Sequence, residues 1–124
     1  MPAAIAQQSG CPALGSNSGL HWDVTRADDL LFCRALTEAQ DEVFSVSISS
    51  DSPFNPVRRN RGEKAVINGQ EVYWYRTEIA TRPDLQARET SIALDNGRVA
   101  YFNVQSASED GLRLAFERIA QLGF

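Results

Sequence analysis

Residues 98–123 read RVAYFNVQSASEDGLRLAFERIAQLG, and the spacing of their apolar side chains changes once along the stretch. The first eight residues alternate between two faces, which is typical of a β-strand. Ser106 followed by Glu109 predicts a capping box that opens a helix, and Gly123 is typical of a helix end. One helical stripe is then apolar, comprising Leu112, Ala115, Phe116, Ile119, Ala120 and Leu122. We therefore expect a strand and then a C-terminal helix, which must cover an apolar surface.

The preceding residues predict a series of antiparallel strands. Asn68-Gly69, between two apolar runs, is the strongest hairpin signal because both residues of a type I′ turn require positive φ. Further turns are expected at residues 25–29, 82–84 and 95–97. Strands are expected at residues 20–24, 30–36, 43–49, 65–67, 72–75, 88–94 and 98–105. The prediction is an α+β domain, an antiparallel sheet of six to seven strands with the C-terminal helix packed on one face.

The length of 124 residues suits one domain, and 43% apolar with 23% charged residues is typical of globular proteins. Residues 1–18 are rich in Gly, Ser, Pro, Gln and Asn and show no periodicity. We expect them to form a flexible arm before a single domain at residues 19–124. Ala4-x-Ala6 is the small-residue pattern that precedes a signal peptidase cut, so residues 1–6 are either the remnant of a secretion signal or an ordinary alanine-rich tail.

The charge balance excludes one class of partner. Twelve basic and 16 acidic side chains give a net charge of −4, which argues against a general nucleic-acid binder. The longest apolar runs are far shorter than the ~20 residues of a membrane-spanning helix. We therefore expect neither a nucleic-acid partner nor a membrane span.

Cys11 and Cys33 are the only cysteines, and His21 is the only histidine. These residues are too few for a four-ligand zinc site, and the C-x-x-C spacing of redox enzymes is absent, so no metal or cofactor is expected. The cysteines form either a disulfide or two free thiols. The Ala4-x-Ala6 pattern favours the disulfide, in a periplasmic or secreted protein. Such a bond contributes about 3 kcal/mol by restricting the unfolded chain.

Candidate catalytic residues are few. A hydrolase would have to use His21, which lies on a predicted strand opposite the core side and is expected to face solvent. Glu78 and Glu89 either face each other across neighbouring strands and share a proton, or form ordinary charge pairs with Arg76 and Arg88. Phosphate-binding and calcium-binding loop motifs are absent. We expect a protein without catalytic activity.

The predicted loop at residues 50–63 is the first candidate for partner binding. It is longer than most loops of compact domains, and such loops are often functional. Phe54 stands between prolines, and Arg58, Arg59 and Arg61 follow it. Prolines reduce the entropy lost on docking, and guanidinium groups bind carboxylates with two hydrogen bonds. The loop therefore either binds a protein partner with an acidic surface, or is a solvated loop whose Phe54 folds back into the core.

The run Tyr73-Trp74-Tyr75 is the second candidate. In a strand, Trp74 faces one way and the two tyrosines face the other. We expect Trp74 in the core and Tyr73 and Tyr75 at a partner-binding surface.

The end of the chain also resembles a known group of domains. DNGRVAYF at residues 95–102, Ser108-Glu109 and FERIAQLGF at residues 116–124 resemble the close of PsbP, Mog1 and DcrB-like domains, and residues 40–44 are similar to an early strand of the Mog1 branch. The resemblance implies an α-β-α sandwich and a non-catalytic accessory or adaptor role. The second helical layer would require a short helix at residues 37–42.

These observations predict a non-catalytic exported protein that acts by binding another protein, as an inhibitor, an immunity factor or an assembly accessory. The first alternative is a carrier of small apolar ligands, which would need a cavity beside Trp74 and Phe116. The second is a hydrolase that uses His21.

Overall fold

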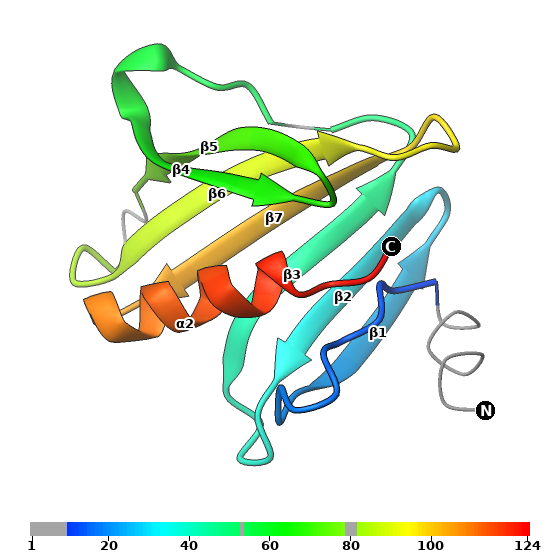
Figure 1. The fold of residues 1–124 in the computed structure, drawn as a ribbon, viewed down its shortest axis with the longest axis horizontal. Coiled ribbons are helices and arrows are strands. Elements are labelled where there is room, and N and C mark those ends of the chain that lie inside the picture. The colour runs from blue at the N-terminus through cyan, green and yellow to red at the C-terminus, as the bar shows by residue number, and fades with distance from the viewer. Residues whose placement is uncertain (1–9, 53, 79–81) are drawn as a thin grey trace.

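Seven strands form one antiparallel sheet, and a helix crosses one of its faces (Figure 1). The structure is a computed structural model that describes residues 10–52, 54–78 and 82–124. The strand order is β1-β2-β3-β7-β6-β5-β4, and all neighbouring strands are antiparallel. The elements are β1 (His21–Ala27), β2 (Leu30–Leu36), β3 (Glu42–Ser49), the 3₁₀ helix η1 (Arg58–Asn60), β4 (Arg61–Ile67), β5 (Gln70–Thr77), β6 (Gln86–Ala93), β7 (Val99–Ser106) and α2 (Glu109–Ala120). The antiparallel sheet and the C-terminal helix predicted from the sequence are confirmed.

The strands form two meanders that meet in the middle of the sheet. β1, β2 and β3 form the first, and β4, β5, β6 and β7 form the second. The hairpin predicted at Asn68-Gly69 joins β4 to β5, with φ values of 50° and 76° at these two residues. β3 and β7 join the meanders, with Val46 opposite Phe102. The connection from β3 to β4 must therefore pass over β7, β6 and β5.

β1 and β4 are among the strands that are longer than predicted. β1 continues to Ala27, which pairs with Leu30, so the expected turn is reduced to Asp28-Asp29. β4 begins at Arg61, inside the predicted loop, and Arg61 pairs with Tyr75 across a register shift. Both extensions consist mainly of polar, exposed residues. Their backbones pair with the neighbouring strand, but their side chains show no alternation of apolar and polar residues from which a strand could be predicted.

The helix cap and one connection also differ from the predictions. The N-cap of α2 is Ser108 and not Ser106, because the Ser108 Oγ accepts a hydrogen bond from the Gly111 N–H at 3.0 Å. Residues 37–42 contain a hydrogen-bonded turn with Gln40 at φ 69° in place of a short helix. The second helical layer implied by the resemblance therefore does not arise there.

The helix side of the sheet, here called the inner face, carries the core. Phe44 of β3, Trp74 of β5 and Phe102 of β7 are each at most 1% exposed. The Phe116 ring of α2 stacks on Trp74, with ring centroids 4.7 Å apart. On α2 and just after it, the buried residues are Leu112, Ala115, Ile119 and Leu122, whereas Ala120, predicted on the same stripe, is exposed. Trp74 thus lies in the core as predicted.

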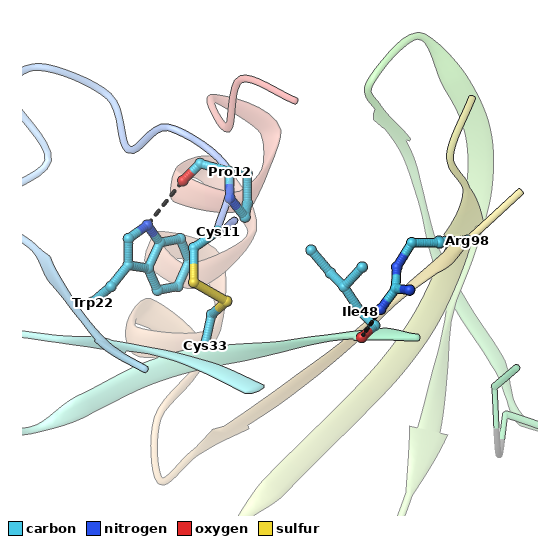
Figure 2. The surroundings of a disulfide bond; sticks show 6 residues. All are labelled: Cys11, Pro12, Trp22, Cys33, Ile48 and Arg98. Atoms are coloured by element: carbon cyan, nitrogen blue, oxygen red, sulfur yellow. Dashed lines mark hydrogen bonds between the residues drawn. A yellow bond between two sulfur atoms is a disulfide. The ribbon is translucent and has the colours of Figure 1, made fainter. Parts of the chain in front are cut away.

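The N-terminal arm is fixed at one end of the inner face. Cys11 is bonded to Cys33 of β2, which confirms the predicted disulfide, and both residues are buried. Figure 2 shows this bond beside Trp22, whose Nε1–H donates to the Pro12 carbonyl at 2.8 Å. Ala13 pairs with Gly123 through two backbone hydrogen bonds of 2.8 and 2.9 Å. The Ala4-x-Ala6 pattern lies outside the described residues.

Candidate partner-binding surface

The connection between β3 and β4 crosses the outer face of the sheet, which is the face opposite α2. We call residues 54–60 the strap. The Phe54 ring packs at its start against Tyr75 of β5 and Tyr101 of β7, with centroid distances of 5.5 and 6.1 Å. Phe54 is half-buried there. It therefore folds back onto the sheet, but on the outer face and not in the core.

The arginines predicted to bind a partner lie at the far end of the strap and at the start of β4. Arg58 and Arg59 form the exposed turn of η1, which closes with a hydrogen bond from the Asn60 N–H to the Val57 carbonyl at 2.8 Å. Arg61 begins β4, and its guanidinium lies 4.2 Å from the centre of the Tyr73 ring. A cation at this distance is attracted by the negative face of the ring. The structure thus brings Arg61 and Tyr73 together.

Tyr73 and Tyr75 face the outer side, opposite Trp74, as the alternation predicts. Both tyrosines are half-buried. Tyr73 contacts Arg61 and Tyr75 contacts Phe54. The structure therefore brings Phe54 to Tyr75 and Arg61 to Tyr73 on the outer face, whereas Arg58 and Arg59 lie on the exposed η1 turn that precedes Arg61.

A polar hollow of about 670 Å³ lies between the strap and the adjoining ends of β5 and β6. Arg59, Arg76, Glu78 and Glu89 line it together with Tyr75. The Arg76 Nη2 donates to the Arg59 carbonyl at 3.5 Å, which places the two arginine residues side by side. Such a hollow offers hydrogen-bonding groups of both charges to a polar side chain of a partner.

Glu78 and Glu89 do not form the pair that shares a proton. The register places Tyr75, not Glu78, opposite Glu89. The Glu89 Oε1 accepts a hydrogen bond from the Tyr101 hydroxyl at 2.7 Å. Burial, together with this carboxylate, raises the pKa of Tyr101 to about 12, so the phenol stays neutral at physiological pH. Glu89 therefore holds a tyrosine in place.

Arg88 has a different partner from the one predicted. Its Nε and Nη2 donate to the two carboxylate oxygens of Glu63 at 3.0 and 3.3 Å. Partial burial acts to raise the pKa of Glu63, but the hydrogen bonds from Arg88 and from its own backbone outweigh burial and hold that pKa below its usual value. This ion pair connects β6 to the edge strand β4 and thereby supports the start of β4 beside the strap.

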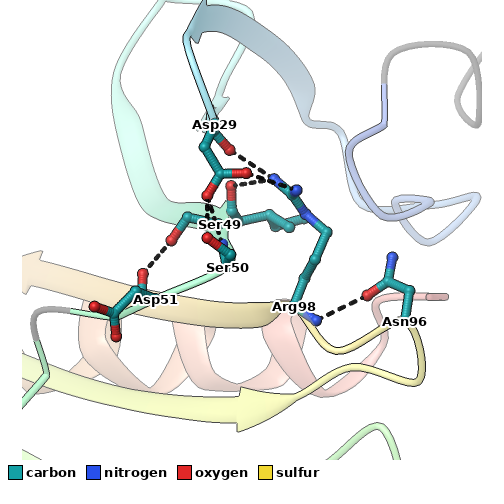
Figure 3. A network of polar contacts seen from close by, with 7 residues as sticks. Asp29, Ser49, Ser50, Asp51, Asn96 and Arg98 are labelled. Carbon is teal, nitrogen blue, oxygen red and sulfur yellow. Dashed lines mark hydrogen bonds and ion pairs between the residues drawn. The ribbon is translucent and has the colours of Figure 1, made fainter.

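A hydrogen-bond network around Asp29 and Arg98 lies at one end of the sheet, and no pattern in the sequence predicts it (Figure 3). Arg98 donates to the Asp29 carboxylate at 2.9 Å, to the Asp29 carbonyl at 2.6 Å and to the Ile48 carbonyl at 3.2 Å. Asp29 also accepts from the backbone N–H and hydroxyl of Ser50 at 2.7 and 2.6 Å. These bonds, chiefly those from Ser50, lower the pKa of Asp29. Residues 29, 50 and 98 lie too far apart in sequence for any spacing rule to connect them.

His21 is the remaining candidate catalytic residue, and it lines a small hollow with Asp23 and Arg34. His21 lies exposed on β1, and no hydrogen bond of its side chain is found among the described residues. No group of three or more His, Cys, Asp or Glu side chains suited to a metal ion occurs in residues 10–52, 54–78 and 82–124. Within the same part of the chain, no helix is both long and apolar enough to cross a membrane.

Comparison with protein-family models, with curated proteins and with solved structures found no match to the chain.

Proposed function

We propose that this is a non-catalytic, exported protein that binds an acidic surface of a protein partner through the strap and the adjoining residues of β4 and β5. The residues that carry this binding are Phe54, Arg58, Arg59, Arg61, Tyr73 and Tyr75. Inhibitors, immunity factors and assembly accessories all act by such binding.

The observation that carries the proposal is that no carboxylate partner is found, among the described residues, for Arg58 and Arg59 of the strap or for the adjoining Arg61 of β4. Six basic residues elsewhere lie within ion-pair distance of a carboxylate, namely Arg34, Lys64, Arg82, Arg88, Arg98 and Arg113. In the described part of the chain, no such pair is found for Arg58, Arg59 or Arg61. In a chain of net charge −4, three neighbouring arginines without a carboxylate form a local positive surface.

The strap is also held in place before any partner arrives. Phe54 packs on Tyr75 and Tyr101 at its start, and the η1 turn at its end runs directly into β4. A loop that is already ordered loses little conformational entropy on binding. Arginine and tyrosine are among the side chains most enriched at the energetic centres of protein interfaces. The strap therefore combines suitable residues with a low cost of ordering.

Export is supported by the disulfide and by the Ala4-x-Ala6 pattern. Disulfides form and persist in oxidising compartments, and this one is fully buried between the arm and β2. We place the protein in the periplasm or outside the cell.

The test compares two variants with the same change in charge. Arg58→Ala with Arg59→Ala removes two arginines of the strap, and Arg113→Ala with Arg118→Ala removes two from α2 on the opposite face. Proteins captured from an envelope extract by the wild type are identified by mass spectrometry, and each purified candidate is titrated by calorimetry. The strap variant should bind the partner at least about tenfold more weakly, and the α2 variant like the wild type. Equal affinity of both variants would exclude the strap as the binding surface.

The alternative function, a carrier of small apolar ligands, required a cavity beside Trp74 and Phe116. The Trp74 and Phe116 rings stack on each other there, so their contact fills the space that a ligand would occupy. A hydrolase would need His21 beside a nucleophile, and among the described residues no hydrogen bond joins the His21 side chain to one.

A further inference from the structure

A second hollow, of about 740 Å³, lies at the end of the sheet where the arm meets the C-terminus. We call it the disulfide-end hollow, because Cys11 forms part of its wall. The turns between β1 and β2, between β4 and β5, and between β6 and β7 all contribute residues, as do Gly123 and Phe124. Its volume falls in the range of about 300–1,000 Å³ that is typical of small-molecule sites. We propose that it binds a small amphiphile with an alkyl body and a cationic ammonium head.

Part of the wall of this hollow is apolar and remains accessible to solvent. Leu30 and Phe124 are 40% and 43% exposed, high fractions for large apolar side chains, and both line the hollow. Leu31, Ile48 and Leu94 complete the apolar wall. An alkyl chain in the hollow would remove the exposed part of these side chains from water, which is favourable.

The walls are also fixed before a ligand binds. The disulfide and the Ala13–Gly123 bridge hold one side. On the other side, Arg98 hydrogen-bonds the Ile48 carbonyl and Asp29 (Figures 2 and 3). A preformed site does not lose binding energy to ordering its own walls. The hollow therefore differs from a gap between mobile loops.

The charges at the rim select the head group. Two arginines and three aspartates line the hollow, so their formal charges leave it at −1. Arg98 is engaged with Asp29. Asp28 and Asp95 line the hollow as well, and no hydrogen bond or ion pair of their carboxylates is found among the described residues. Their carboxylates can therefore receive an ammonium group above the apolar wall, whereas an anionic head would be repelled.

The test uses the full chain with its disulfide intact and two probes that differ only in the head. Decyltrimethylammonium and decanoate are titrated below their micelle concentrations and followed by amide chemical shifts. The cationic probe should give saturable shifts around Leu30, Leu94 and Phe124, and decanoate should bind at least about fivefold more weakly. Equal binding of both probes, or shifts spread over the surface without saturation, would overturn the proposal.

Three double variants separate this site from the strap and from general charge effects. Asp28→Asn with Asp95→Asn should remove the preference for the cationic probe, and the matched pair Asp110→Asn with Glu117→Gln on α2 should preserve it. Arg58→Ala with Arg59→Ala should bind the cationic probe like the wild type, so failure of the strap proposal leaves this result unaffected. A preference that survives at the Asp28 and Asp95 variant would show that these carboxylates do not receive the head group, and would overturn the assignment.

Discussion

The two faces of the sheet are covered by different means. The inner face is covered by α2, whose Leu112, Ala115 and Ile119 are buried, and by an arm fixed through a disulfide. The outer face is crossed by the strap, which rests on the half-buried Phe54 and ends in exposed arginines. Because burial of apolar area is the main source of stability, the inner face should determine the stability of the fold. The outer face retains the charged groups through which we propose that a partner is bound.

The largest effect is expected where a charge enters the inner face. Phe116→Asp would place an unpaired carboxylate against Trp74, and it would remove the ring that stacks there at 4.7 Å. We expect a loss of about 4 kcal/mol in the free energy of unfolding, measured by urea denaturation. Leu114→Asp on the same helix is the control, because Leu114 is 40% exposed and should lose less than about 1 kcal/mol. Equal losses would show that α2 is not oriented as described.

Removing the disulfide should have the next largest effect. Cys11→Ala with Cys33→Ala should lower the free energy of unfolding by about 3 kcal/mol, since the unfolded chain is no longer restricted. The wild type in reductant should lose a similar amount, and reductant should not affect the double variant. A wild type insensitive to reductant after complete reduction, verified by mass, would show that the bond does not stabilise the fold.

A smaller effect is expected on the outer face. Phe54→Ala removes ring contacts with Tyr75 and Tyr101 and should cost about 1 kcal/mol in stability. Its effect on partner affinity should exceed its effect on stability, because the strap arginines then lose their fixed position. Val57→Ala is the control, as Val57 is 44% exposed. If Phe54→Ala bound the partner with unchanged affinity, the position of the strap would not determine partner binding.

Arg61→Ala tests the contact with Tyr73. The guanidinium lies 4.2 Å from the ring centre at an exposed edge, where such contacts contribute about 0.5–1 kcal/mol. The expected loss of stability is within this range, and Arg61→Lys should recover part of it. A loss as large as that of the disulfide variant would mean that Arg61 has a structural role that the contact with Tyr73 does not explain.

The smallest effect depends on pH. The pKa of Tyr101 is raised from 10.0 to about 12, so the unfolded chain loses this proton at lower pH than the folded chain does. The contribution to stability is therefore complete below pH 10 and is lost as the pH rises to about 12. Denaturation at several pH values should show this decline in the wild type and a shallower one in Tyr101→Phe. Identical profiles would exclude Tyr101 as the titrating group.

Several features of the inner face could be predicted from the sequence because they leave periodic patterns. The apolar positions of β3, β7 and α2 recur with the periods of a strand and a helix, and the Asn68-Gly69 turn has its own signal. The outer face was less predictable. Phe54 was expected either in the core or at a partner, and only the path of the strap shows that it rests on Tyr75 and Tyr101.

The ion pairs were the least predictable part of the molecule. Arg88 pairs with Glu63 and Arg98 with Asp29, although carboxylates lie much closer to both arginines in sequence. Their partners follow from the strand order, because the meeting of β3 with β7 brings the β1–β2 turn near Arg98. Periodicity gives the strands but not their order, so it could not locate these pairs.

The strap is also the covalent link between the two meanders of the sheet. Apart from β3 and β4, all strands that follow each other in sequence pair within one meander, and both cysteines of the disulfide precede the strap. A protease that cut the strap would therefore leave two fragments, held together by the β3–β7 ladder, the Ala13–Gly123 bridge and the buried core. We expect the nicked protein to stay associated in native buffer, to separate in denaturant and to reassemble by fragment complementation.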